Sequence, residues 1–68
     1  ERIGRAVSDF LRTQEADVRV LFVRRYFYME SVSELARRFD MSENVISVKL
    51  HRARKKLKKV LKQEGIDV

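Results

Sequence analysis

Cysteine and proline are both absent from this 68-residue chain. Without cysteine the chain can form no disulfide and no thiolate metal site, which is compatible with a reducing cytosol. Long apolar runs are also missing, so the sequence contains no recognisable membrane-spanning segment and no signal peptide. His51 is the only histidine and is a poor candidate for a metal ligand. A chain of this length has room for one small domain with one modest core.

The sequence also lacks the usual patterns of catalysis. It contains no glycine-rich phosphate loop, no nucleophile paired with a base, and no pair of carboxylates in an identifiable cleft. Glu15 and Asp17 are better interpreted as charges at the start of a helix. We therefore expect a domain that is not an enzyme and that needs no cofactor.

The positive charge is concentrated at one end of the chain. Residues 1–48 contain eight Lys or Arg and eight Asp or Glu, whereas residues 49–68 contain eight and two, which leaves a net charge of +6 there. Such a block indicates a polyanionic partner, with nucleic acid first and an anionic membrane surface second. The basic side of this segment lacks the large apolar side chains that would insert into a bilayer, so membrane binding is the least favoured of the functions considered.

Residues 42–62 have the periodicity of one long amphipathic helix. Ser42 is a suitable N-cap, and Gly65 ends the helix with Ile66 folding back on Leu61. One side carries the apolar residues Ile46, Leu50, Ala53, Leu57 and Leu61. The other side carries Asn44, Val48, His51, Arg52, Lys55 and Lys59. A helix packed from behind and exposed in front suits recognition of the DNA major groove, and a solvated helix of a bundle is the alternative.

A second, shorter helix is expected just before it, at residues 31–39. Ser31 and Glu34 match the capping box. Val32, Leu35, Ala36 and Phe39 form the expected buried face. Asp40 can adopt the left-handed conformation that ends a helix, and Met41 can fill the gap between the two helices. A short capped helix, a three-residue turn and a longer helix predict a helix-turn-helix.

Two more helices are expected upstream. The first covers about residues 1–12, with Ile3, Val7, Phe10 and Leu11 on one face. Thr13 is the predicted N-cap of the second, which runs to about Tyr28. This helix is apolar on more than one side: Phe22 and Tyr26 are expected in the core, whereas a place in the core and a docking surface are equally favoured for Val20, Val23 and Phe27. The predicted fold class is all-α, a small four-helix domain with a C-terminal helix-turn-helix and a long basic recognition helix.

Residues 25–57 resemble the C-terminal domain, region 4, of bacterial sigma-70 family factors, and are closest to the extracytoplasmic-function type. The matching positions are Arg25-Tyr26, Ser31, Ala36, Ser42-Glu43, Leu50, Arg52-Ala53-Arg54 and Leu57. The resemblance extends from about Leu11 to Leu61, and Leu50 to Leu57 is its most specific part. It covers a helix-turn-helix at about residues 31–57 within a domain of residues 1–68. Because the first residue is not Met, we expect the domain to be a fragment of a larger protein.

The resemblance implies a function and a set of partners. Region 4 places its second motif helix in the major groove of the promoter −35 element, and its earlier helices dock on the flap of the RNA polymerase β subunit. In many such factors an anti-sigma protein competes for these surfaces. Implied partners are therefore double-stranded promoter DNA, RNA polymerase core and, in such systems, an anti-sigma factor. Val20, Val23 and Phe27 are the candidate partner-binding residues, and the implied location is cytoplasmic.

The DNA-binding positions implied by the resemblance depart in part from the common pattern. The family usually has Gly at Asn44, Lys or Arg at Ser47 and a polar residue at Val48, and Arg is common at Lys49. Asn44 can hydrogen-bond to adenine and Val48 can contact a thymine methyl, so we expect the domain to prefer A/T-rich binding sites. Arg52 can pair with guanine or hold a phosphate. The candidate DNA-binding residues are Ser31, Arg37, Ser42, Asn44, Ser47, Val48, Lys49, His51, Arg52 and Lys55.

Two other functions fit the same sequence. The first is the DNA-binding output domain of a transcriptional regulator, which differs from a sigma factor in the domain that accompanies it. The second is a helical protein-interaction module, in which the apolar second helix binds a partner and the basic helix is incidental. Neutralising Arg52 and Lys55 would leave partner binding intact in that case.

Overall fold

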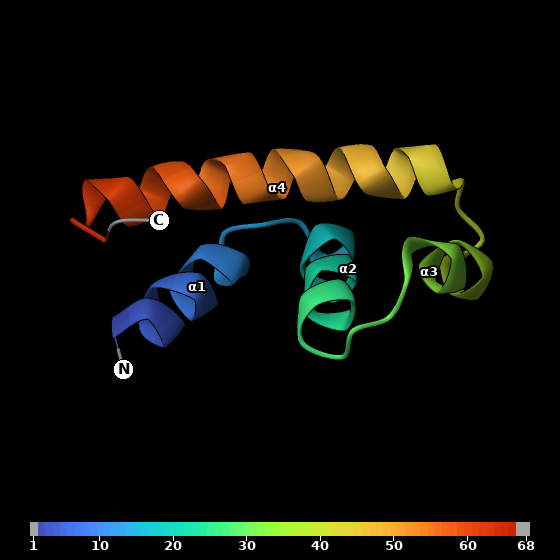
Figure 1. Ribbon diagram of the computed structural model, residues 1–68, viewed down its shortest axis with the longest axis horizontal. Helices are drawn as coiled ribbons and strands as arrows, with labels where there is room; N and C mark the ends of the chain where they lie inside the picture. The colour runs from blue at the N-terminus through green and yellow to red at the C-terminus, as the bar shows by residue number, and fades with distance from the viewer. Residues whose placement is uncertain (1, 67–68) are drawn as a thin grey trace.

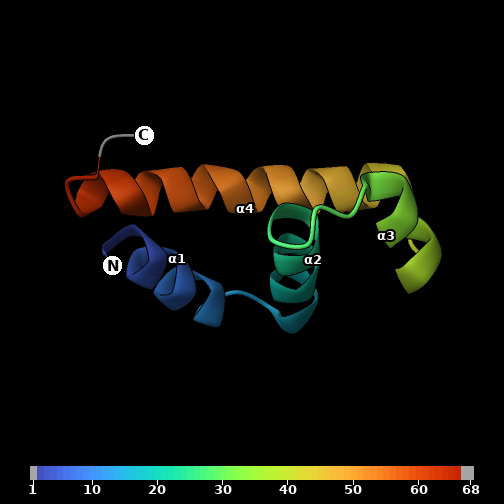
Figure 2. The ribbon, with the colours of Figure 1, turned by 60° about the horizontal axis from the view of Figure 1, so that its bottom comes forward.

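The computed structural model describes residues 2–66, which form four α-helices and no strand within that range. The helices are α1 (Arg2–Arg12), α2 (Ala16–Tyr26), α3 (Val32–Phe39) and α4 (Glu43–Gln63). The long helix α4 runs the length of the molecule, and α1, α2 and α3 lie side by side along it (Figures 1 and 2). Helix α4 contacts each of the other three, and α2 also contacts α3. The all-α prediction is confirmed.

The core lies where α2 and α3 meet α4. Leu21, Leu35 and Ile46, one from each of these helices, are the most completely buried large side chains. Phe10 and Leu11 of α1 extend this core. A second, smaller cluster of Ala6, Leu61 and Ile66 lies where the start of α1 meets the end of α4. The apolar stripe predicted for α4 is thus its packed side.

The helix-turn-helix forms as its capping residues predict. Ser31 Oγ accepts the Glu34 backbone N–H, and the Glu34 carboxylate accepts the Ser31 N–H, so the capping box is complete. Asp40 has φ 52°, and Met41 N–H bonds to Ala36 O at 3.1 Å. Ser42 Oγ then caps α4 by accepting the Val45 N–H. Met41 packs against the core, as expected of the turn's apolar residue.

The end of α4 is a Schellman motif that also fastens α1. Gly65 has φ 77°, a value that favours glycine, and Ile66 N–H bonds to Leu61 O at 2.8 Å. Ile66 is buried against Leu61 and Ala6. The Arg2 guanidinium donates to the carbonyl of Glu64, beside this turn. The start of α1 and the end of α4 are therefore held together by one apolar and one polar contact.

Three predicted details are wrong, two in the upstream helices and one in α3. Thr13 does not cap α2, because its hydroxyl donates to Phe10 O and completes α1, and Glu15 occupies the N-cap position instead. Helix α2 ends at Tyr26 rather than near Tyr28, and the chain turns at Met29, which has φ 59°. Phe39, predicted on the buried face of α3, is 36% exposed, and the guanidinium of Arg24 lies over its ring at 5.8 Å.

Helix α1 also differs from the predicted pattern. Ile3 is 49% exposed, whereas Ala6 is buried against the end of α4. The inward face is thus rotated toward Ala6, because α4 covers this side of the helix. The predicted first residue of this helix lies outside the described residues.

Candidate nucleic-acid interface

One side of α4 is exposed along its first three turns and carries mostly polar residues. Because Ile46 and Leu50 are buried behind it, this side faces solvent. It brings together six of the predicted DNA-binding residues, all of them exposed: Asn44, Ser47, Val48, His51, Arg52 and Lys55. We call these six the α4 face. Val48 is 38% exposed, so its methyl groups are accessible to a ligand.

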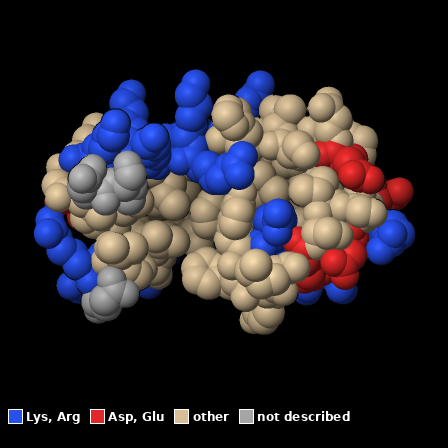
Figure 3. Space-filling model, viewed as in Figure 1, with Lys and Arg blue, Asp and Glu red and all other residues tan. Residues whose placement is uncertain are grey.

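The basic charge continues from this face toward the end of α4. Lys55, Lys56, Lys58, Lys59 and Lys62 are all exposed. In the space-filling view, Lys and Arg gather over the C-terminal half of α4, whereas Asp and Glu gather at the other end of the molecule (Figure 3). On this face the positive charge is thus densest over the C-terminal half of α4, which suits a polyanionic ligand.

The remaining predicted contacts lie at helix starts and on the flanks. Ser31 and Ser42 are exposed N-caps, and each hydroxyl keeps its proton available to donate because its oxygen accepts the capping bond. Arg37 of α3 is exposed, and its guanidinium lies 3.4 Å from Ser33 Oγ. Lys49 differs from the others. It lies on the flank of α4 that faces α2, with its ammonium 3.1 Å from Asp17 Oδ2.

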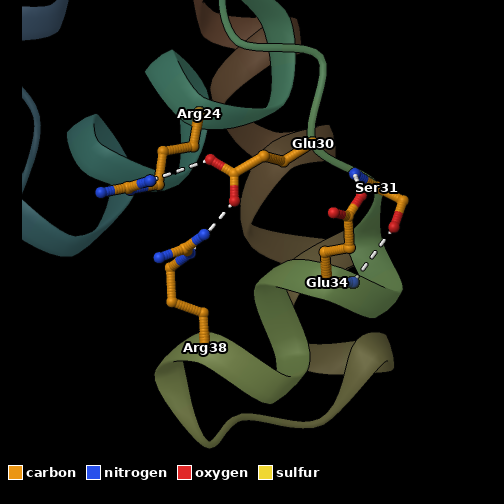
Figure 4. A network of polar contacts seen from close by, with 5 residues as sticks. All are labelled: Arg24, Glu30, Ser31, Glu34 and Arg38. Carbon is orange, nitrogen blue, oxygen red and sulfur yellow. Dashed lines mark hydrogen bonds and ion pairs between the residues drawn. The ribbon is translucent and has the colours of Figure 1, made fainter.

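The first helix of the motif, α3, is also tied to α2 through Glu30. Its carboxylate accepts from Arg24 of α2 at 2.9 Å and from Arg38 of α3 at 3.1 Å, and its side chain is only 13% exposed (Figure 4). The Arg25 guanidinium approaches Glu30 O at 3.4 Å. Sequence reasoning missed this residue, because no local spacing rule connects a loop carboxylate to arginines on the two flanking helices.

The ion pairs of Glu30 with Arg24 and Arg38 should make the stability of the domain depend on pH. The hydrogen bond from Arg24, together with the charges of Arg38 and Arg24, lowers the pKa of Glu30 below its ordinary value of 4.5. The folded state therefore binds fewer protons here than the unfolded state, so this contribution to stability is present above pH 4.5 and is lost as pH falls through the lower folded pKa.

The variant Glu30→Gln should have a lower melting temperature than the wild type at neutral pH, and the difference should shrink in acid. Thermal unfolding followed by circular dichroism across this pH range measures both effects. Glu43→Gln is the control, since Glu43 is exposed at the start of α4 and takes part in none of the ion pairs described for residues 2–66. A Glu30→Gln difference that stays constant with pH would contradict the prediction.

An apolar groove is formed by α1, α2 and the residues that follow α2. The groove, of about 680 Å³, runs between α1 and α2 and is lined by Ile3, Gly4, Val7, Ser8, Leu11, Val23, Phe27 and Tyr28. Phe27 is 62% exposed and Val20 is also exposed, whereas Val23 is half-buried and packs against the core. Val20 and Phe27 therefore lie on the surface, whereas Val23 contributes both to the core and to the lining of the groove.

Other kinds of site find no support in the described part of the chain. Residues 2–66 contain no group of three His, Asp or Glu side chains placed to hold a metal ion. Within the same range, no helix is both long enough and apolar enough to cross a bilayer. The features that remain are a polar and basic helix face and an apolar groove, both of which are typical of macromolecular recognition.

Comparison with known proteins agrees with this geometry. No curated protein matched the sequence. Residues 5–57 match the family described as "Sigma-70, region 4", and the match spans most of α1, all of α2 and α3, and α4 as far as Leu57. It includes the capping box, the turn at Asp40 and the whole α4 face. That family consists of DNA-binding regulatory domains rather than enzymes, and it acts in transcription initiation. The chain belongs to the sigma-70 region 4 family.

Proposed function

We propose that this domain recognises the promoter −35 element through the α4 face and docks on RNA polymerase through its apolar groove. The observation that supports DNA recognition best is the α4 face itself. It is exposed on a helix whose opposite side is buried against α2 and α3. An α-helix fits the major groove, and a rigidly held one can present side chains to base edges.

The side chains of the α4 face favour a particular readout. Asn44 has the amide geometry that pairs with adenine, and Val48 can contact only a thymine methyl. Ser47 can hydrogen-bond to several bases but brings no charge. Arg52 adds a planar fork that pairs with guanine or holds a phosphate. We infer a site that is A/T-rich opposite the first two turns of α4.

Phosphate contacts would supply most of the affinity. The hydroxyls of Ser31 and Ser42 lie at helix N-termini, where phosphates are attracted by free N–H groups and by the helix dipole. Lys55 adds positive charge within the α4 face, and Arg37 and Lys49 add positive charge beside it. Binding by the isolated domain is therefore expected to be weak and to fall steeply as salt rises. Tethering to polymerase would raise the effective concentration at the promoter.

Binding-site selection from random duplexes tests the readout directly. The expected result is an A/T-rich consensus opposite Asn44 and Val48, obtained with the wild-type domain at low salt. The matched control is Val48→Ser, which introduces the polar residue common in the family and should relax the preference for thymine at one position. A consensus dominated by G/C contacts at these positions would contradict the proposal.

The proposed docking site is the groove between α1 and α2, and its partner is the β-subunit flap of RNA polymerase. The groove offers apolar side chains from both helices, with Phe27 and Tyr28 at its edge. Large exposed apolar surfaces on small domains mark interaction sites. An anti-sigma factor would compete for the same surface, and the complex would act in the cytoplasm.

A pull-down with the isolated β-flap segment tests the docking site. Phe27→Glu should abolish binding, because it places a charge at the edge of the groove. Met29→Glu is the matched control: Met29 is 74% exposed and does not line the groove, so binding should persist. Absence of binding by a folded wild-type domain that still binds DNA would overturn the docking proposal and favour a regulator of transcription.

A further inference from the structure

An exposed ion pair joins Lys49 of α4 to Asp17 in the first turn of α2. Lys49 Nζ lies 3.1 Å from Asp17 Oδ2, and the two side chains are 32% and 45% exposed. The hydrogen bond from Lys49 lowers the pKa of Asp17, so the carboxylate is charged at neutral pH. Because both partners remain accessible, an approaching anion can compete for the ammonium.

Lys49 also lines a cleft in which α4 presents three cations, Lys49, Arg52 and Lys56. This cleft, of about 150 Å³, is lined by Gln14, Glu15, Val18, Lys49, Arg52, Ala53 and Lys56. Arg52 is shared between the cleft and the α4 face, so the two surfaces are continuous. When a helix lies in the major groove, its flanks face the sugar-phosphate backbones. A duplex that contacts Arg52 thus brings phosphates toward Lys49.

We propose that Asp17 competes with DNA phosphates for Lys49 and thereby lowers the affinity of the domain for duplex DNA. This inference rests on the proposed function, in which α4 binds DNA. To meet a phosphate, the Lys49 ammonium must leave or share the Asp17 carboxylate, and that carboxylate also repels the phosphate. An exposed ion pair is weak enough for a phosphate to displace it.

The pair is not needed to hold the fold together. Glu30 is well shielded and joins two arginines across the α2–α3 connection, whereas Asp17 pairs with a single, accessible lysine. Asp17 Oδ1 also accepts the Val18 N–H at 2.8 Å, an interaction that the amide oxygen of asparagine can replace. Removing the charge therefore leaves the first turn of α2 with an acceptor, which makes Asp17→Asn a mild substitution.

A salt titration of DNA binding tests the proposal. The probe is a labelled random-sequence duplex of about three helical turns, because a phosphate contact does not depend on sequence. Asp17→Asn should bind about twofold to fivefold more tightly at low salt, the range expected for an exposed ion pair. The plot of log K against log salt concentration should also become steeper by about one phosphate contact. Asp9→Asn is the matched control, since Asp9 has the same charge on α1 and an exposed partner, Arg12, at 3.6 Å.

A double-mutant cycle separates this role from a general effect of charge. In a Lys49→Gln background, Asp17→Asn should change binding no more than Asp9→Asn does. An equal effect of Asp17→Asn with and without Lys49 would overturn the inference, and so would equal effects of the two Asp→Asn variants in the wild-type background. Thermal unfolding checks that each variant is folded, and Asp17→Ser, which keeps a hydroxyl acceptor, replaces the Asn variant if that one unfolds.

The same titration distinguishes a failure of the proposed role of Asp17 from a failure of the proposed DNA interface. Wild-type binding that Asp17→Asn leaves unchanged would overturn the role of Asp17 and leave the α4 face intact. A folded wild-type domain that binds no duplex even at low salt would overturn both the DNA interface and the inference that rests on it.

Discussion

Replacing Leu35 by alanine is expected to lower the free energy of unfolding by about 2–5 kcal/mol. Leu35 is 0% exposed and lies in the core with Leu21 and Ile46, so truncation removes buried methyl groups and leaves a cavity among three helices. A chain of this size is expected to have a total stability of only about 3–10 kcal/mol. The variant should therefore be largely or partly unfolded at moderate temperature, as urea denaturation followed by far-UV circular dichroism would show.

The matched control is Val45→Ala, on the exposed part of α4. Val45 is 42% exposed and stands next to the buried Ile46, so it shares the helix but not the core. Its truncation should change stability by about 0.5 kcal/mol or less. If Leu35→Ala and Val45→Ala had equal effects, the arrangement of the core described for α3 and α4 would be contradicted.

The second large effect is expected on DNA binding. Arg52→Ala should weaken binding to the selected duplex by about tenfold or more, because a bidentate arginine contact contributes about 1–3 kcal/mol. Arg52 is exposed on the α4 face and its guanidinium has no partner that would compete with DNA in the contacts described for residues 2–66. Fluorescence anisotropy at fixed salt measures the loss.

Two further variants show how Arg52 acts. Arg52→Lys keeps the charge but loses the planar fork, so it should restore binding if the contact is a phosphate and fail to do so if the contact is a guanine. Lys62→Ala, in the last turn of the same helix, removes a charge far from the α4 face and should have little effect. Unchanged binding by Arg52→Ala would show that the readout lies elsewhere on the domain.

Local signals predicted most of the fold. The capping box at Ser31, the N-cap at Ser42 and the Schellman end at Gly65 are short-range hydrogen-bond patterns, and all three form as predicted. Thr13 shows where such signals fail. A threonine between two helices can cap the second or complete the first, and only the geometry of the turn decides that its hydroxyl bonds to Phe10 O.

The surface of α4 was predictable for a similar reason. Burial of Ile46 and Leu50 exposes the opposite side, so the α4 face follows from the helical period. The pairing of Lys49 with Asp17 and the links from Glu30 to Arg24 and Arg38 did not follow. The first contact joins two helices and the second joins a loop residue to two helices, so both depend on how the helices pack rather than on the order of residues. Neither the Asp17 contact nor the Glu30 contacts could therefore be predicted from local spacing in the sequence.

The contact between Arg2 and Glu64 also bears on the order in which the chain folds. It joins residues 62 positions apart, whereas the helix-turn-helix joins neighbours. Closing so long a loop costs more entropy than forming local contacts, and it gains little until α4 already exists as a helix. We expect α3 and α4 to form the early nucleus, with α2 docking next. The small cluster of Ala6, Leu61 and Ile66 would then close last, so that formation of α4 does not wait for the start of α1 to pack against its end.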